Sequence, residues 1–232
     1  MAAVTICLPT FNERENIEAM LRALAQYGVR VLVIDDNSPD GTGEIADRLA
    51  SELDFVSVLH RPRKEGLGPA YIEGFHRALD DGADYVISMD CDFSHDPADV
   101  PRLIGAAVAG ADIVIGSRYV QGGGTANWGL GRRIVSAGGS FYARTILGLK
   151  IRDMTGGFRC FHRAVLEQVG LDTIKTKGYA FQIEVTYRAV RQGFTVAEVP
   201  IIFPDRTKGK SKMTRAIFLE AVRKVPALRL RH

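Results

Sequence analysis

The sequence contains few cysteines and no long apolar run. Cys7, Cys91 and Cys160 lie far apart and form no CxxC pair, which argues against a disulfide framework and against a zinc site. No run of about 18 apolar residues is present, so we expect no membrane-spanning helix. The first residues enter a predicted strand directly, which leaves no room for a signal peptide. These absences predict a cytoplasmic chain with reduced cysteines in its core.

Basic residues are concentrated at the C-terminal end. Residues 206–232 contain nine lysines and arginines but only one acid, Glu220, whereas the whole chain has a net charge of +3. The remainder therefore carries −5, from 21 basic and 26 acidic residues. A basic tail on an acidic body suits an anionic partner such as a phosphate group or a membrane surface. Nucleic acid fits poorly as a partner, because the tail lacks interleaved aromatic residues and recognised binding motifs.

Apolar runs alternate with helix-like segments in the first half of the chain. This pattern predicts an α/β fold with a mainly parallel central sheet flanked by helices. Residues 193–203 alternate only partly, which suits an edge or antiparallel strand. We expect one compact domain over 1–205 and a basic tail over 206–232. The expected strands are 4–8, 29–34, 56–59, 85–89 and 112–115, and the expected helices are 17–26, 41–53, 69–80, 97–107 and 132–147.

Two aspartates follow the fourth of these strands. Residues 85–89 run into Asp90-Cys91-Asp92, and open α/β sheets bind their ligands beyond the carboxyl ends of the strands. Mg²⁺ and Mn²⁺ take hard oxygen ligands and commonly bind through one or two carboxylates plus substrate phosphates. One interpretation of the motif is therefore a divalent cation on a diphosphate, and the other is a solvated turn.

Polar residues also follow the first two strands. The second strand runs into 35–41, DDNSPDG, which carries more carboxylate and amide groups than a turn requires. The first strand runs into 8–16, LPTFNEREN, which could be only a loop that caps the next helix. Three polar strand ends in one sheet predict a shared cleft.

Two other chemistries fit parts of this pattern less well. Residues 41–46, GTGEIA, match a loose dinucleotide-binding pattern, but the neighbouring aspartates would repel a pyrophosphate. Residues 90–94, DCDFS, are similar to the strand-end motif of haloacid-dehalogenase-type phosphatases, in which the first aspartate is a nucleophile. That chemistry requires a later strand that ends in paired acids, and no such strand is expected after residue 116.

Eight segments together resemble the family 2 glycosyltransferases and, among them, the polyprenyl-phosphate (dolichyl-phosphate) mannose synthases. The combination is specific and covers nearly the whole chain. The resemblance implies a GT-A-type nucleotide-binding fold and inverting transfer of mannose from GDP-mannose to a polyprenyl phosphate, with Mg²⁺ or Mn²⁺. The segments are LPTFNEREN (8–16), DDNSPDGT (35–42), GLGPAY (66–71), MDCDFSHDP (89–97), GSRY (116–119), DMTGGFR (153–159), KGYAFQIE (177–184) and RTKGKSKM (206–213).

The resemblance implies which residues would bind the donor and the metal. Asp92 would hold the metal together with Ser94, which stands where the family often has a glutamine. His95 is expected to be a loop or helix-capping residue instead, because a hard cation gains little from imidazole. The nucleotide-sugar set is Pro9, Phe11, Glu13, Ile34, Asp36, Asp90, Cys91, Asp92, Arg206 and Lys212.

The resemblance also implies the catalytic and acceptor residues. Asp92, Arg118 and Asp153 are the expected catalytic residues, although Asp153 could instead cap a turn. Arg118, Arg133 and Ser136 would contact the acceptor phosphate. A phosphate monoester has its second pKa near ~6, so at neutral pH it attacks without a strong general base.

Two alternative functions stay open at this point. A polyprenyl-phosphate glucosyltransferase, or a related transferase that uses a UDP-sugar, would carry similar motifs. A non-catalytic nucleotide-binding subunit is a further alternative, but the intact Asp90, Asp92, Arg118 and Lys212 argue against it.

The tail has a helical pattern of its own. Apolar residues between Ile217 and Leu228 recur every three or four positions, which predicts an amphipathic helix over 214–228. The surrounding basic residues favour a helix on the cytoplasmic face of a membrane, whereas packing of the apolar face on the catalytic domain is the alternative. Many members of the resembled family continue into transmembrane helices. Either this helix or a separate membrane-anchoring subunit would then attach the enzyme peripherally.

Overall fold

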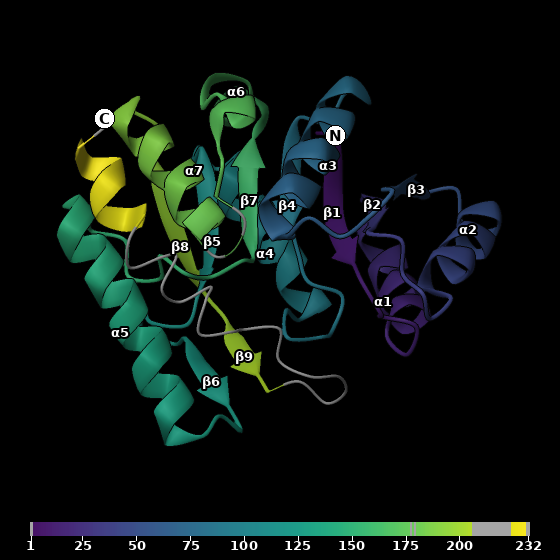
Figure 1. The fold of residues 1–232 in the computed structure, drawn as a ribbon, viewed down its shortest axis with the longest axis horizontal. Coiled ribbons are helices and arrows are strands. Elements are labelled where there is room, and N and C mark those ends of the chain that lie inside the picture. The colour runs from purple at the N-terminus through teal and green to yellow at the C-terminus, as the bar shows by residue number, and fades with distance from the viewer. Residues whose placement is uncertain (1, 177, 179, 206–223, 231–232) are drawn as a thin grey trace.

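The computed structural model describes residues 2–176, 178, 180–205 and 224–230. Strands and helices alternate through the first half of the chain, as the apolar pattern predicts (Figure 1). The strands are β1 Val4–Thr10, β2 Arg30–Asp35, β3 Val56–His60, β4 Tyr85–Ser88, β5 Ile113–Ser117, β6 Gly124–Ala126, β7 Arg159–His162, β8 Val196–Pro200 and β9 Ile202–Pro204. The helices are α1 Ile17–Leu24, α2 Thr42–Glu52, α3 Leu67–Asp80, α4 Val100–Val108, α5 Leu130–Leu147, α6 Arg163–Gln168 and α7 Ala180–Arg191.

Seven strands form the central sheet, in the order β3-β2-β1-β4-β7-β5-β8. The neighbours β1–β2, β2–β3, β1–β4 and β5–β8 are parallel, and only β7 runs antiparallel to β4 and β5. The mainly parallel sheet predicted from the sequence is therefore confirmed. A second, two-stranded sheet pairs β6 with β9.

Of the two alternatives for residues 193–203, an edge or an antiparallel strand, the structure shows the edge strand. Within the described chain, β8 lies at one edge of the central sheet, as expected, but it is parallel to β5, and β9 is parallel to β6. The antiparallel strand is β7, which the sequence did not reveal. Because β7 has only four residues, and Arg159 and His162 stand at its ends, it shows no apolar run.

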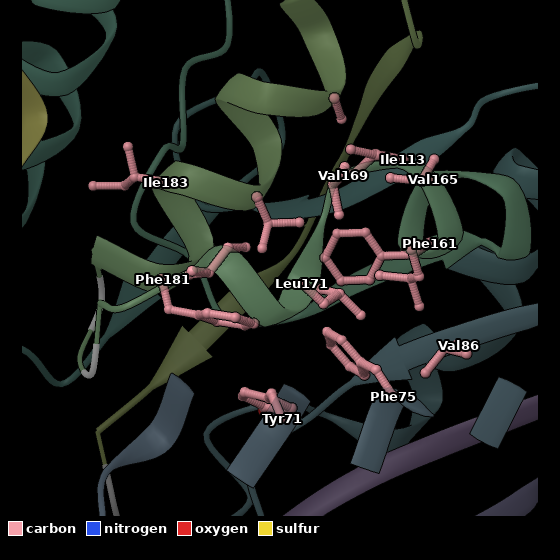
Figure 2. Packing of buried hydrophobic residues seen from close by; sticks show 14 of the residues in the cluster. Tyr71, Phe75, Val86, Ile113, Phe161, Val165, Val169, Leu171, Phe181 and Ile183 are labelled. Atoms are coloured by element: carbon pink, nitrogen blue, oxygen red, sulfur yellow. The ribbon is translucent and has the colours of Figure 1, made fainter. Parts of the chain in front are cut away.

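Helices cover both faces of the sheet. Residues of α1, α2 and α4 pack on one face in one buried cluster, and residues of α3, α5, α6 and α7 belong to a second cluster on the other face. Figure 2 shows the aromatic centre of this second cluster, where Tyr71 and Phe75 of α3 meet Phe161 of β7 and Phe181 of α7. Close packing of these rings fixes α3 and α7 against the middle of the sheet.

The described end of the tail belongs to the second cluster. Residues 224–230 are helical, and Val225 and Leu228 are buried in it. Arg229 Nη1 donates a hydrogen bond to the Ile146 carbonyl oxygen of α5 at 2.5 Å. The membrane-facing position expected for the apolar side of 214–228 is therefore wrong for Val225 and Leu228, which pack on the catalytic domain. The other residues of the tail, 206–223, lie outside the described residues.

None of the helices in the described residues is both long enough and apolar enough to span a bilayer.

Candidate active site

The loops that carry the predicted site leave one edge of the central sheet. Thr10 of β1 lies opposite Asp35 of β2, and Ser88 of β4 lies opposite Cys7 of β1. These strands are parallel, so their carboxyl ends point the same way. The sheet order makes β5 parallel to them as well. The polar strand ends therefore lie on one side of the sheet, and the shared cleft predicted there stays a prediction.

The loops after β1 and β2 are tied together by Asp35. Its carboxylate accepts hydrogen bonds from Ser38 N at 3.0 Å, from Ser38 Oγ at 2.6 Å and from Thr10 Oγ1 at 3.1 Å. The Asn12 backbone N donates to Ser38 Oγ at 3.1 Å. Asn12 and Asn37 both have positive φ angles, of 59° and 56°, which asparagine tolerates better than most residues. These bonds fix two tight loops before any ligand binds.

Asp36 is paired with a buried arginine that the sequence reading missed. Arg61 is 4% exposed and forms an ion pair with Asp36, and its Nε donates to Glu73 Oε2 at 2.7 Å. Burial raises the pKa of Asp36 above its usual value, and the charge and hydrogen bond of Arg61 only partly offset this effect. Arg61 follows β3 directly, so the rule applied to the other strand ends could have found it.

The other residues predicted to bind the nucleotide lie in or just after β1 and β2, and their surroundings differ. The Lys64 Nζ lies over the Phe11 ring, 4.0 Å from the centre of that ring. Glu13 accepts a hydrogen bond from Asn16 Nδ2 at 2.9 Å. Pro9 lies opposite Ile34 in the sheet, but Ile34 is fully buried in the cluster beneath α3. The Ile34 side chain packs in the core, and its contact with the nucleotide stays a prediction.

The loop after β4 holds Asp92 in a fixed orientation. Asp92 Oδ1 accepts hydrogen bonds from Ser94 N at 3.1 Å and from Ser94 Oγ at 2.5 Å. Phe93 between them has a φ of 59°, a left-handed conformation that is strained for a bulky residue and is typical of functional loops. Asp92 and Cys91 are buried, whereas Asp90 is partly exposed. Ser94 supports Asp92, and its role as a metal ligand stays a prediction.

His95 is a structural residue of this loop. Its Nδ1 accepts a hydrogen bond from the Asp90 backbone N at 2.9 Å, and its ring stacks on Phe158 with centroids 4.9 Å apart. These contacts agree with the expected loop role of His95, and its exclusion from the metal site stays a prediction. The stacking also connects the Asp90–Asp92 loop to the segment that precedes β7.

Arg118 and Asp153 form a buried bidentate ion pair. Arg118 Nε and Nη2 each donate to the Asp153 carboxylate at 2.7 Å, and Nη2 also donates to Thr155 Oγ1 at 3.0 Å. Burial alone would raise the pKa of Asp153, but the charge and hydrogen bonds of Arg118 outweigh burial and hold that pKa below its usual value. Asp153 therefore stays a carboxylate and fixes the Arg118 guanidinium just beyond β5.

Arg159 stabilises the segment that follows Asp153. It is fully buried, and its Nε, Nη1 and Nη2 donate to the carbonyl oxygens of Gly156, Gln182 and Met154 at 2.8, 2.6 and 2.7 Å. Burial lowers the pKa of Arg159 to about 10. These bonds fix the segment between Asp153 and β7 to α7.

Two of the predicted acceptor residues, Arg133 and Ser136, lie on α5, and the third, Arg118, lies in the loop after β5. Tyr119 donates its hydroxyl hydrogen to Ser136 Oγ at 2.7 Å, and the Arg118 guanidinium lies 5.2 Å from the Tyr119 ring centre. Arg133 is exposed on the same helix. The structure thus brings Arg118 and Ser136 together through Tyr119. Arg206 and Lys212 lie outside the described residues.

Comparison with known proteins identifies the family. The sequence profile described as "Glycosyl transferase family 2" matches residues 5–170. The chain belongs to this family. It is 46% identical over 223 residues to "Polyprenol monophosphomannose synthase" of Mycolicibacterium smegmatis, covering 95% of this chain and 84% of that protein. It is 47% identical over 224 residues to "Undecaprenyl-phosphate mannosyltransferase" of Micrococcus luteus, covering 96% of this chain and 91% of that protein.

A solved structure confirms the fold class of this glycosyltransferase. Glucosyl-3-phosphoglycerate synthase from Mycobacterium tuberculosis, in complex with Mn²⁺, UDP-glucose and phosphoglyceric acid, superimposes with a TM-score of 0.70. The match covers 99% of this chain and 79% of that one at 21% identity. The expected GT-A-type fold is confirmed.

The oxygen atoms around Asp92 fit a hard divalent cation in this glycosyltransferase. In the part of the chain that the structure describes, no group of three or more His, Cys, Asp or Glu side chains could hold a metal alone. Asp92 would supply a carboxylate and Ser94 a hydroxyl, whose oxygens lie 2.5 Å apart, whereas His95 Nδ1 is bonded to the Asp90 backbone N. Mg²⁺ and Mn²⁺ commonly accept such a sparse set and complete their coordination with phosphate oxygens and water.

Proposed function

We propose that this glycosyltransferase transfers mannose from GDP-mannose to a polyprenyl phosphate, with inversion at the anomeric carbon. The observation that carries the proposal is the identity of 46–47% over almost the whole chain to two relatives named for mannose transfer to polyprenols. The Asp90–Asp92 loop is intact and follows β4, beside the ordered loops after β1 and β2 that we propose to bind the nucleotide. This arrangement favours a catalytic protein over a non-catalytic subunit.

The site chemistry supports attack by an acceptor phosphate. With a second pKa near ~6, this phosphate is an anion at neutral pH and needs no strong base. Asp153 is bound to Arg118 as a carboxylate, so we assign it the positioning of Arg118 rather than proton removal. Arg118 would place its positive charge beside the acceptor phosphate, near Arg133 and Ser136.

The donor side would be held at the ends of β1, β2 and β4. Asp36, oriented by Arg61, would contact the nucleoside, and Phe11 and Glu13 would line the same loops. Asp92, with Ser94 behind it, would hold Mg²⁺ or Mn²⁺, which when bound neutralises charge on the leaving diphosphate. Arg206 and Lys212 of the basic tail would contact the donor phosphates.

Two donor nucleotides, GDP and UDP, are compatible with the family of this chain. A UDP-sugar is bound in the solved relative that shares this fold, so a UDP-sugar donor is the competing hypothesis. The two mannose-named relatives favour GDP-mannose. We also place the enzyme peripherally on the cytoplasmic face of a membrane, with or without a separate anchoring subunit, because the proposed acceptor is a lipid.

The test is a transfer assay on the purified chain. GDP-mannose and UDP-glucose are offered separately with a short polyprenyl phosphate and Mg²⁺ or Mn²⁺, and the lipid product is identified by mass spectrometry. We expect a hexosyl product from GDP-mannose only. A product from UDP-glucose alone would support the glucosyl alternative, and no product from either donor would contradict the proposed reaction.

Asp92→Ala should lower the rate of transfer by at least about 100-fold, as the loss of a key electrostatic contact does. Excess chelator should have the same effect on the unaltered chain. Asp81→Ala is the matched control, because Asp81 is an exposed acid after α3, paired with Arg77, and it should leave the rate unchanged. Full activity in chelator would exclude the metal.

A further inference from the structure

The guanidinium of Arg118 lies among three aromatic rings. Its Cζ is 5.2 Å from the ring centre of Tyr119, 5.4 Å from that of Phe203 and 5.7 Å from that of Trp128. Tyr119 follows Arg118 in the chain, but Phe203 belongs to β9, and Trp128 lies between β6 and α5. A cation within about 6 Å of a ring centre is attracted by the negative face of the ring. Two other segments of the chain therefore contribute to the environment of Arg118.

The rings of Trp128 and Phe203 stand nearly perpendicular to each other. The angle between their planes is 82° and their centroids are 5.3 Å apart, an edge-to-face arrangement that is favourable between aromatic rings. The Arg132 guanidinium lies 3.9 Å from the Trp128 ring centre and is itself paired with Asp205. Contacts from α5 and β9 thus hold the Trp128 ring beside Arg118.

The hydrogen bonds of Arg118 to Asp153 and Thr155 constrain some of its movements more than others. Arg118 Nε and Nη2 donate to the Asp153 carboxylate at 2.7 Å each, and Nη2 also donates to Thr155 Oγ1 at 3.0 Å. These three bonds lie along one edge of the planar guanidinium, so they resist its sliding more than its rotation about that edge. The attraction to the Trp128 and Phe203 rings opposes this rotation, because the attraction is lost as the guanidinium turns away.

Packing alone does not account for a tryptophan at position 128. The indole Nε1 is buried and has no hydrogen-bond partner among the residues that the structure describes, which costs stability. A phenylalanine would avoid this cost. Among the aromatic side chains, however, the indole attracts a cation most strongly, and the Trp128 ring contacts the guanidinium groups of both Arg118 and Arg132. An indole therefore suits this position because of its negative face.

We propose that Trp128, supported by Phe203, is a positioning residue that holds Arg118 in the orientation in which Arg118 contacts the acceptor phosphate. The inference rests on the proposed function for the role of Arg118. Trp128 acts through Arg118 and takes no part in bond making or breaking. Trp128 and Phe203 both lie outside the eight segments that carry the family resemblance.

The first test is a kinetic comparison of Trp128→Leu and Trp128→Phe with the unaltered chain. The acceptor is geranyl phosphate, a short polyprenyl phosphate, and the donor is whichever nucleotide sugar supports transfer. Trp128→Leu removes the ring, and we expect the KM for geranyl phosphate to rise about 5–10-fold. The values of kcat and of the KM for the donor should stay unchanged, because the lost contact helps to bind only the acceptor. Trp128→Phe keeps a ring and should restore most of the loss.

Phe75→Leu is the matched control for a general loss of packing. Phe75 is a buried aromatic residue whose ring contacts Tyr71, Phe161 and Phe181 in the second cluster. This substitution should lower the melting temperature without changing either KM. The inference is overturned if Trp128→Leu leaves the acceptor KM unchanged, if it raises both KM values equally, or if Phe75→Leu raises the acceptor KM as much.

A double-mutant cycle tests whether Trp128 acts through Arg118. Arg118→Lys keeps the positive charge but loses the planar group that bonds to Asp153 along one edge. In this background, Trp128→Leu should raise the acceptor KM little further, because residues that act through one another have non-additive effects. Additive effects of the two substitutions would contradict the positioning role.

Fluorescence tests the inference without any transfer reaction. Trp128 is the single tryptophan of the chain, so its emission reports the surroundings of Arg118. Geranyl phosphate, added without a nucleotide sugar, should change this emission saturably, whereas geraniol, which lacks the phosphate, should not. Phe203→Leu should raise the half-saturating concentration about 5–10-fold.

The fluorescence result also separates this inference from the proposed function. If no nucleotide sugar supports transfer but the emission responds to geranyl phosphate and the response weakens in Phe203→Leu, the proposed reaction is wrong and the positioning role stands. An emission that does not respond to geranyl phosphate, or that responds equally to geraniol, overturns the positioning role.

Discussion

At the scale of single residues, buried ion pairs shape the site. Arg118–Asp153 and Arg61–Asp36 each bury an arginine beside a carboxylate at the end of a strand. Removing one partner of such a pair leaves an uncompensated charge in the interior, which is strongly destabilising. Most other ion pairs in the described chain are exposed and contribute little. These two pairs therefore fix the side chains that we propose to contact the donor and the acceptor.

Asp153→Asn should lower the free energy of unfolding by about 3–5 kcal/mol at neutral pH, because Arg118 stays buried without its carboxylate. Urea unfolding followed by circular dichroism measures this loss. Asp81→Asn, in the exposed pair with Arg77, is the control and should change stability little. Equal effects of the two substitutions would contradict the importance of the buried pair.

The same pair predicts a pH dependence. The pKa of Asp153 is lower in the folded protein than in the unfolded chain, so the unfolded chain takes up the proton first as the pH falls. The stabilisation is therefore complete above the unfolded pKa of about 4 and is lost below it. The difference in unfolding free energy between the unaltered chain and Asp153→Asn should shrink towards acid pH.

At the scale of elements, the sequence predicted the repetitive half of the fold well. All five expected strands and the helices between them are present within a few residues, because each has its own apolar pattern. The sequence did not predict β7 and α6, which occupy residues 159–168, or α7, which occupies residues 180–191. α7 is buried on nearly all sides, so it has no polar face to give a helical period, and β7 is too short to show alternation.

The site divides in the same way. The acids at strand ends were predictable because parallel strands bring their carboxyl ends together. Arg61 follows β3 and could have been found by the same rule, whereas Tyr119 was not predicted, because its importance depends on which hydroxyl lies opposite in three dimensions. The role of His95 was predictable from metal chemistry, but its stacking on Phe158 depends on the position of β7.

Gly68→Ala should destabilise the protein by about 1–3 kcal/mol through overpacking. A Cβ at Gly68, in the first turn of α3, would collide with the backbone carbonyl oxygen of Thr176. Gly105→Ala is the matched control in α4, where a Cβ meets nothing within 4 Å. It should raise the free energy of unfolding by about 0.5–1 kcal/mol, because alanine favours the helix more than glycine does. Chemical denaturation of both variants gives the comparison, and a stabilised Gly68→Ala would show that α3 can move away from Thr176.

At the scale of the whole molecule, the C-terminal helix completes the core. Val225 and Leu228 reach the cluster that contains residues of α3, α5, α6 and α7. Parts of the sequence separated by more than 140 residues thus meet in one core, so we expect the two ends of the chain to unfold together. The described part of the basic tail, residues 224–230, thus packs on the catalytic domain.

Leu228→Ala should lower the free energy of unfolding by about 2–4 kcal/mol, because it leaves a cavity in this cluster. Leu230→Ala is the control, since Leu230 is 88% exposed, and it should change stability very little. Guanidinium unfolding of both variants measures the difference. Equal stability of the two variants would show that the helix is not part of the cooperative core.

The position of β7 has a consequence for the order of events during synthesis. β7 fills the centre of the sheet between β4 and β5, yet the ribosome makes it after both. Until residues 159–162 have emerged, β4 presents an unpaired backbone edge to the cell for several seconds at about 5–20 residues per second. The nascent chain is therefore most prone to mispairing and aggregation while the second half of the protein is being translated. A chaperone that binds the nascent chain would protect this edge until residues 159–162 have emerged and would be dispensable for it afterwards.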